Sequence, residues 1–158
     1  MVTAPTLLDR VVDEVGRVVD PEIPVLTIAD IGILRGVIVD GDRVTVTITP
    51  TYSGCPAMDA IRADVADALD RAGCTDGEIR TVLAPAWTTD WMSDEAKAKL
   101  VAYGVAPPRH GRLRHQPVLC PRCRSGSTRT VSEFGSTACK ALQVCGSCGE
   151  PFDRFKEL

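Results

Sequence analysis

Histidine and long apolar runs are scarce in this chain of 158 residues. Its two histidines, His110 and His115, both follow residue 105, so residues 1–105 cannot form a cysteine–histidine catalytic pair by themselves. No apolar run approaches the roughly 18 residues of a membrane span. Phosphate-binding glycine loops are absent as well. Because the chain begins without the basic and apolar regions of a signal peptide, we expect a cytoplasmic protein.

Aromatic residues are also few, at 4%, and charge is unevenly distributed. Residues 1–104 carry 9 basic and 17 acidic side chains, whereas residues 105–158 carry 9 basic and 4 acidic ones. This asymmetry indicates two modules. The basic module is either solvated or docked on an acidic partner, or it offers a surface to another macromolecule or anionic ligand. Nucleic acid is not an expected partner, because aromatic platforms are lacking among the basic residues.

The apolar periodicity of residues 1–105 predicts helices and strands in mixed order. Thr6 and Asp9 are spaced as a capping box that opens the first helix. The fold class we expect is α+β, with a small two-layer α/β sandwich whose helices lie on one sheet face. The expected helices span residues 7–19, 56–72 and 93–104, and the expected strands span 33–39, 43–49 and 78–84.

Residues 106–117 differ from both flanking segments because proline, arginine and histidine dominate them. Such a composition is typical of a linker. The sequence therefore predicts a first α/β domain over residues 1–105, a linker over 106–117 and a small ribbon over 118–158.

Four cysteines of the last segment form two Cys-x-x-Cys pairs. Two intervening residues let one tight turn offer both sulfurs to an ion, and a second turn completes a tetrahedron. The pattern predicts a structural zinc ribbon with short strands near residues 128–134 and 141–144. Iron, an iron–sulfur cluster or a redox dithiol pair are the alternatives. The predicted ligands are Cys120, Cys123, Cys145 and Cys148.

Cys139 is surplus to this set. It is either a small buried apolar residue or an additional thiol close to the metal.

Cys55 stands alone in the first module, directly before a predicted helix. The positive end of the helix dipole would favour a thiolate and lower the pKa of Cys55. Such a thiolate can ligate a metal, receive a persulfide or attack an electrophile, and the alternative is an inert buried cysteine. Asp20 and Glu22 follow the first helix and are expected at the same end of the sheet, unless they only cap a turn or face solvent.

Three segments carry a resemblance to a known family: Asp20-Pro-Glu-Ile-Pro, Asp30-Ile-Gly-Ile-Leu34 and Thr51-x-x-x-Cys55-Pro56. They resemble the MIP-type family of iron–sulfur carrier and assembly domains, which includes SufT-like proteins. The ribbon segment Phe134-Gly-Ser-Thr-Ala-Cys139, together with residues 145–156 and 87–92, is similar to the PaaD-like branch of that family.

The resemblance implies that Cys55 is the functional thiol, that Asp20 and Glu22 form its supporting acidic turn, and that Cys139 lies in a matching segment. It also implies an accessory role in aerobic phenylacetate breakdown, helping iron–sulfur cluster or metal-centre assembly in the multicomponent phenylacetyl-CoA epoxidase. Iron or a cluster would be held transiently, since one cysteine cannot complete the coordination. The implied partners are the oxygenase and reductase components, the iron–sulfur assembly machinery and, for shared ligation, a second copy of the chain. No catalytic residue is expected.

Two other functions remain open from the sequence alone. The chain would otherwise be a scaffold protein of the oxygenase complex that carries no iron, or an independent thiol enzyme.

Overall fold

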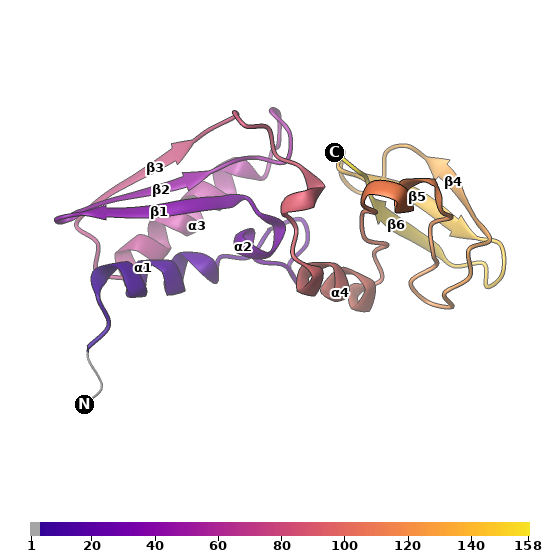
Figure 1. The fold of residues 1–158 in the computed structure, drawn as a ribbon, viewed down its shortest axis with the longest axis horizontal. Coiled ribbons are helices and arrows are strands. Elements are labelled where there is room, and N and C mark those ends of the chain that lie inside the picture. The colour runs from indigo at the N-terminus through magenta and orange to yellow at the C-terminus, as the bar shows by residue number, and fades with distance from the viewer. Residues whose placement is uncertain (1–3) are drawn as a thin grey trace. The chain divides into compact units, whose positions relative to one another are not determined.

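The computed structural model describes residues 4–158, except for the side chains of Arg112 and Arg114. It consists of two compact units, which join between Trp87 and Thr88 (Figure 1). The helix expected after Ser93 thus belongs to the second unit, although the sequence division groups it with the first. The domain bounds derived from the sequence remain a prediction. Among the described residues, no helix combines the length and apolar character that crossing a bilayer requires.

In the first unit, helices cover one face of a three-stranded sheet (Figure 1). The strand order is β1-β2-β3, with β1 and β2 antiparallel and β2 and β3 parallel. Parallel neighbours need a crossover connection, which α3 supplies. The elements are α1 (Leu7–Gly16), α2 (Ile28–Ile31), β1 (Leu34–Asp40), β2 (Arg43–Ile48), α3 (Met58–Arg71) and β3 (Asp76–Thr81).

The core of the first unit forms where the sheet meets the helices. Val44, Val46 and Ile48 alternate along β2 and are completely buried. The intervening threonines belong to the opposite sheet face, as expected for a strand with one buried side. Val15 of α1 and Val65 of α3 are also fully buried. The mixed α/β architecture predicted from the sequence is therefore confirmed for this unit.

The first helix begins as predicted but ends early. Thr6 and Asp9 form both hydrogen bonds of the capping box. The helix stops at Gly16 instead of continuing to Val19, because Val19 pairs with Thr27 in an isolated β-bridge. That bridge closes a turn followed by the short helix α2, which the sequence analysis did not predict.

The second unit contains a helix and an antiparallel three-stranded ribbon of order β4-β5-β6. The sequence predicted two ribbon strands and missed β6. Phe152 and Phe155, its two buried phenylalanines, are three residues apart, so β6 lacks the period-two pattern of a half-buried strand. The elements are η1 (Thr89–Trp91), α4 (Asp94–Tyr103), η2 (Gly111–His115), β4 (Thr128–Ser132), β5 (Lys140–Cys145) and β6 (Pro151–Phe155).

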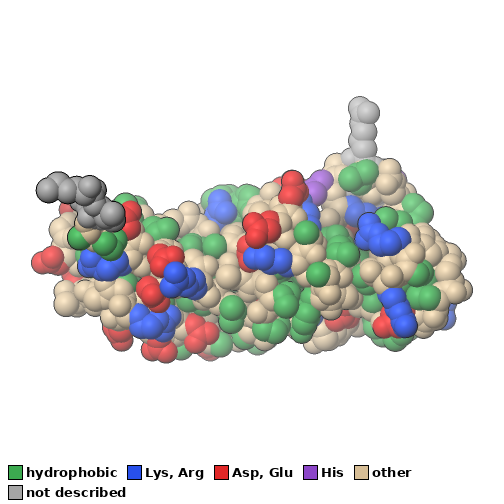
Figure 2. Space-filling model, turned by 90° about the horizontal axis from the view of Figure 1, so that it is seen from below, with side chains coloured by type: hydrophobic (Ala, Val, Ile, Leu, Met, Phe, Trp, Pro, Cys, Tyr) green, Lys and Arg blue, Asp and Glu red, His purple; other side chains and the backbone are tan. Residues whose placement is uncertain are grey.

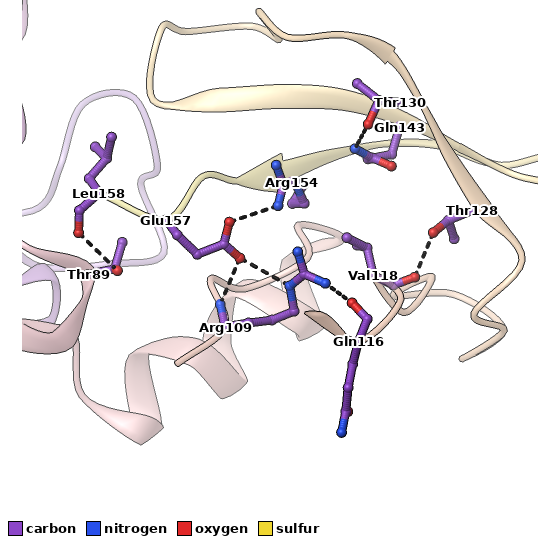
Figure 3. A network of polar contacts seen from close by, with 10 residues as sticks. All are labelled: Thr89, Arg109, Gln116, Val118, Thr128, Thr130, Gln143, Arg154, Glu157 and Leu158. Atoms are coloured by element: carbon purple, nitrogen blue, oxygen red, sulfur yellow. Dashed lines mark hydrogen bonds and ion pairs between the residues drawn. The ribbon is translucent and has the colours of Figure 1, made fainter. Parts of the chain in front are cut away.

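The segment between α4 and the ribbon is attached to β6 over part of its length. The Ala106 amide donates to the Asp153 carbonyl at 2.9 Å, and the Phe155 amide donates to the Ala106 carbonyl at 2.9 Å. The Arg109 guanidinium also contacts the Gln116 carbonyl (Figure 3). This segment therefore makes contacts that its linker-like composition does not indicate.

Glu157 joins that segment to the end of β6 (Figure 3). Its carboxylate accepts hydrogen bonds from the backbone and side chain of Arg109, both at 3.1 Å, and from Arg154 at 2.8 Å. Burial by itself would raise the pKa of Glu157. The hydrogen bonds and the positive charge of Arg154 outweigh that effect and hold the pKa below its usual range.

Replacing Glu157 with Gln should lower the melting temperature of the second unit at pH 7. A carboxyl group with a depressed folded-state pKa stabilises the fold above its unfolded pKa of about 4.3, and this contribution is lost as pH falls through the folded value. The difference between the wild type and E157Q should therefore shrink below about pH 4. Calorimetry between pH 3 and pH 7 measures it. The exposed Glu133 provides a matched control, E133Q, which should melt like the wild type; an equal effect of both variants would contradict the role of Glu157.

Candidate functional site

The four cysteines predicted as ligands lie together at one end of the ribbon. Their sulfur atoms are all within 4.8 Å of one another. The Sγ atoms of Cys120 and Cys148 are 3.8 Å apart, and those of Cys123 and Cys145 are 3.6 Å apart. Sulfurs bound tetrahedrally to zinc at about 2.3 Å are separated by about 3.8 Å, so the arrangement suits a zinc ion. With four protein ligands, such a site is closed to substrate.

The two cysteine pairs sit on turns with the same backbone geometry. In the first turn the Arg124 amide donates to the Cys120 carbonyl, and in the second the Gly149 amide donates to the Cys145 carbonyl, both at 2.9 Å. Gly149 has a φ of 76°, in the left-handed region that glycine adopts easily. A Cβ on Gly146 would lie 2.8 Å from the Ser127 hydroxyl, so a larger residue at this position would have to displace Ser127.

The charges of this cluster require a cation. Backbone hydrogen bonds from Cys148 and Ser147 lower the pKa of Cys145 to about 6. For Cys148, a backbone hydrogen bond at Glu150 lowers the pKa, but burial and the other sulfurs outweigh it and raise the pKa to about 12. Four such close sulfurs cannot all be ionised unless a metal compensates them. The donor set and its charge therefore support zinc binding by the ribbon.

Cys139 lies outside the four-sulfur cluster among the described residues. It is 4% exposed, just before β5, and its sulfur is 3.0 Å from the Thr137 hydroxyl. Its surroundings fit the interpretation of a small buried residue better than that of an accessible thiol.

Cys55 lies in the loop between β2 and α3 and is half-buried. Its amide donates to the Tyr52 carbonyl at 3.2 Å, and its own carbonyl accepts from the Met58 amide at the start of α3. The flanking residues Gly54 and Pro56 are exposed. The backbone of Cys55 is thus fixed by a tight turn between β2 and α3, and the residue as a whole remains partly exposed.

The predicted lowering of the Cys55 pKa is wrong. Burial raises the pKa of the Cys55 thiol, and the negative charges of Glu22 and Asp20 raise it further. Hydrogen bonds with the Ala57 backbone and the Thr51 side chain act in the opposite direction but do not compensate. Burial has the largest effect, α3 begins only at Met58, three residues beyond the thiol, and the nearby carboxylates oppose ionisation further.

The two acidic residues of the turn after α1 differ in their surroundings. Asp20 is 6% exposed, and its carboxylate accepts hydrogen bonds from the amides of Glu22 and Ile23, both at 2.8 Å. It therefore holds the turn together, which was the structural alternative raised from the sequence. Glu22 is half-buried, and its charge acts on Cys55. The structure thus brings the predicted acidic turn and Cys55 into one electrostatic environment.

Thr51 is the contact of Cys55 that the residue-by-residue reasoning left without a role. In the sequence, Thr51 is only the first residue of the motif Thr51-x-x-x-Cys55-Pro56, with no role assigned to its side chain. That short spacing across a Gly-containing loop is the signal that the chain turns back and brings the hydroxyl to the sulfur.

Two family models match the chain in succession. Residues 8–80 match a model described as an iron–sulfur cluster assembly protein, and residues 105–156 match the PaaD zinc beta ribbon domain. The second match includes the segment before the ribbon, which pairs with β6.

Named relatives fall into a full-length and a partial group. The chain is 47% identical over 156 residues to a putative 1,2-phenylacetyl-CoA epoxidase subunit of Escherichia coli, covering 97% of this chain and 94% of that protein. It is 41% identical over 85 residues to an Fe-S protein maturation auxiliary factor of Porphyromonas gingivalis, covering 52% of this chain and 80% of that protein. Among solved structures, a domain of unknown function (DUF59) from Bacillus anthracis is similar with a TM-score of 0.55 and 28% identity, covering 60% of this chain and 91% of that one.

Removing zinc should unfold the ribbon and leave the first unit folded. The small core of the ribbon includes Cys120 and Cys145 together with Phe152, so loss of the ion removes ligands and core at once. In a ¹H–¹⁵N spectrum after treatment with a strong chelator, amides of β4–β6 should collapse to random-coil shifts while those of β2 keep their positions. Adding zinc back should restore the spectrum. Dispersed β4–β6 signals without metal would show that the ion is not structural.

Replacing Glu22 with Gln should increase the reactivity of Cys55. Because Glu22 raises the pKa of the thiol, removing its charge lowers that pKa and enlarges the thiolate fraction near pH 8. The measurement is the pH dependence of iodoacetamide alkylation, followed by mass spectrometry at the peptide containing Cys55. The half-buried Cys74 in the same chain is an internal control and should react equally in wild type and E22Q. An unchanged or slower Cys55 reaction would exclude the proposed electrostatic coupling.

Proposed function

The chain belongs to the PaaD family of 1,2-phenylacetyl-CoA epoxidase subunits, and from this we propose that it is an accessory factor that matures a metal centre of that enzyme system. The observation that carries the proposal is the combination of an iron–sulfur assembly domain with a half-buried, approachable cysteine beside an acidic turn. The cargo is iron or a nascent iron–sulfur cluster, bound through the sulfur of Cys55.

A raised pKa suits transient binding better than permanent binding. At neutral pH Cys55 is held as the thiol, so an incoming iron ion or cluster must displace its proton, and the return of that proton assists release. Glu22 contributes to this balance because its negative charge disfavours the free thiolate yet attracts a cation. One thiolate leaves the remaining cluster positions to other ligands, which a client protein or a second copy of the chain would supply.

The zinc ribbon has a separate role in this proposal. Its four sulfurs are committed to a structural ion, so they are not part of the cargo site. The proposed partners are the oxygenase and reductase components, the iron–sulfur cluster of the reductase being the proposed client centre. The whole chain is then a non-catalytic accessory protein with one working thiol in residues 1–105 and one folded metal module in residues 118–158.

An independent thiol enzyme is disfavoured by two features of the chain. Residues 1–105 contain no histidine to act as a base for Cys55. Burial and the nearby carboxylates raise the pKa of the Cys55 thiol, which opposes nucleophilic catalysis at neutral pH.

Replacing Cys55 with Ser should abolish maturation of the epoxidase in cells while preserving the fold. Anaerobically purified wild type should hold about one zinc and a labile fraction of iron and sulfide, and C55S should keep the zinc but lose the iron. Epoxidase turnover and the iron content of its components report on maturation. C74S is the matched control, because Cys74 is also half-buried in the first unit but is not part of the acidic site. Full epoxidase activity with C55S would reject the carrier role and favour a scaffold that carries no iron.

A further inference from the structure

A groove in the second unit exposes apolar side chains that the proposed function does not use. It has a volume of about 240 Å³ and lies between the end of α4, the segment before the ribbon and the first cysteine turn. Leu113 and Leu119 line it and are 49% and 44% exposed. Large apolar side chains exposed in a hollow are typical of a binding surface.

The sequence around this groove contains basic residues but no acidic ones. Residues 105–132 contain six arginines and no aspartate or glutamate. The charges of two of these arginines are compensated by salt bridges to glutamates near the C-terminus, Arg109 to Glu157 and Arg122 to Glu150. Arg124 lines the groove, is exposed and forms no ion pair within the described part of the chain. The ribbon part in Figure 2 shows basic side chains lying among hydrophobic ones.

The backbone of Arg124 adds an independent observation. Its φ is 65°, the one left-handed conformation of a non-glycine residue in the described chain. The equivalent position in the second cysteine turn is Gly149, which has the same hydrogen bond to its cysteine and a φ of 76°. A side chain in this conformation is disfavoured relative to glycine. The first turn therefore has an arginine at a position where the second turn has a glycine. Residues with a strained backbone of this kind cluster at functional sites.

We propose that this groove docks an extended segment of a partner protein in which carboxylates flank a large apolar side chain. The apolar side chain enters between Leu113 and Leu119, and a carboxylate pairs with the Arg124 guanidinium. A protein segment fits better than nucleic acid, because the lining is aliphatic and proline-rich and has no aromatic residue on which a base could stack. The groove lies wholly in the second unit, so this inference does not depend on Cys55.

The experiment selects random twelve-residue peptides displayed on phage against the zinc-loaded full chain, and measures the selected peptide by fluorescence anisotropy. The enriched peptides should place aspartate or glutamate beside leucine or phenylalanine. Their affinity should fall at least tenfold for R124G and for L119S. The matched control is R129G, since Arg129 is exposed on β4 outside this groove, and it should bind within twofold of wild type. No enrichment, peptides without acidic residues or equal binding to all variants would overturn the proposal.

R124G also separates binding from a structural role. Because glycine relieves the left-handed strain, this variant should keep one zinc per chain and melt at the same or a higher temperature while losing the peptide. If R124G instead loses zinc or has a lower melting temperature than the wild type, Arg124 stabilises the zinc ribbon and the proposal is wrong.

Two other occupants give distinguishable results. Binding of a single-stranded 20-nucleotide DNA that R124G abolishes, with no selected peptide, would identify a nucleic-acid surface. A concentration-dependent dimer in sedimentation that L119S dissociates would identify a second copy of the chain. Either result would overturn the choice of a partner protein.

Discussion

The second unit depends on the charge of four cysteine sulfurs within 4.8 Å of one another. Such a group cannot be fully ionised without a cation at its centre, and two of its members also form the small ribbon core. We therefore expect metal binding and folding of the ribbon to be coupled.

The solitary cysteine of the first unit follows the opposite principle. Cys55 is half-buried beside two carboxylates, and these surroundings raise its pKa instead of lowering it. The ribbon places four sulfurs around one ion site, whereas the first unit offers a single sulfur, and in the role we propose its ionisation is induced by the cargo. This difference between the two sites is consistent with the proposal that the chain keeps its zinc but releases its cargo.

The arginine-rich segment connects sequence composition to a surface. Six arginines without a carboxylate over residues 105–132 suggested a linker with a basic surface, but salt bridges from the C-terminal residues neutralise part of this charge. Among the described side chains, Arg124 keeps its positive charge without an ion pair and lies beside the exposed Leu113 and Leu119. Charge that is left unpaired next to apolar surface favours recognition of another protein over solvation alone.

The sequence by itself determined the α/β layer, the capping box at Thr6 and the cysteine spacing of the ribbon, because each depends on periodicity or spacing within a few residues of the chain. The tertiary structure decided what depends on residues distant in sequence. It determined the direction of the Cys55 pKa shift, which comes from burial and from the turn 35 residues earlier. It also added β6, whose phenylalanines follow no strand period, and the salt bridges that tie the supposed linker to the C-terminus. Local patterns specify elements, but burial and the sum of charges around a group exist only after the chain has folded.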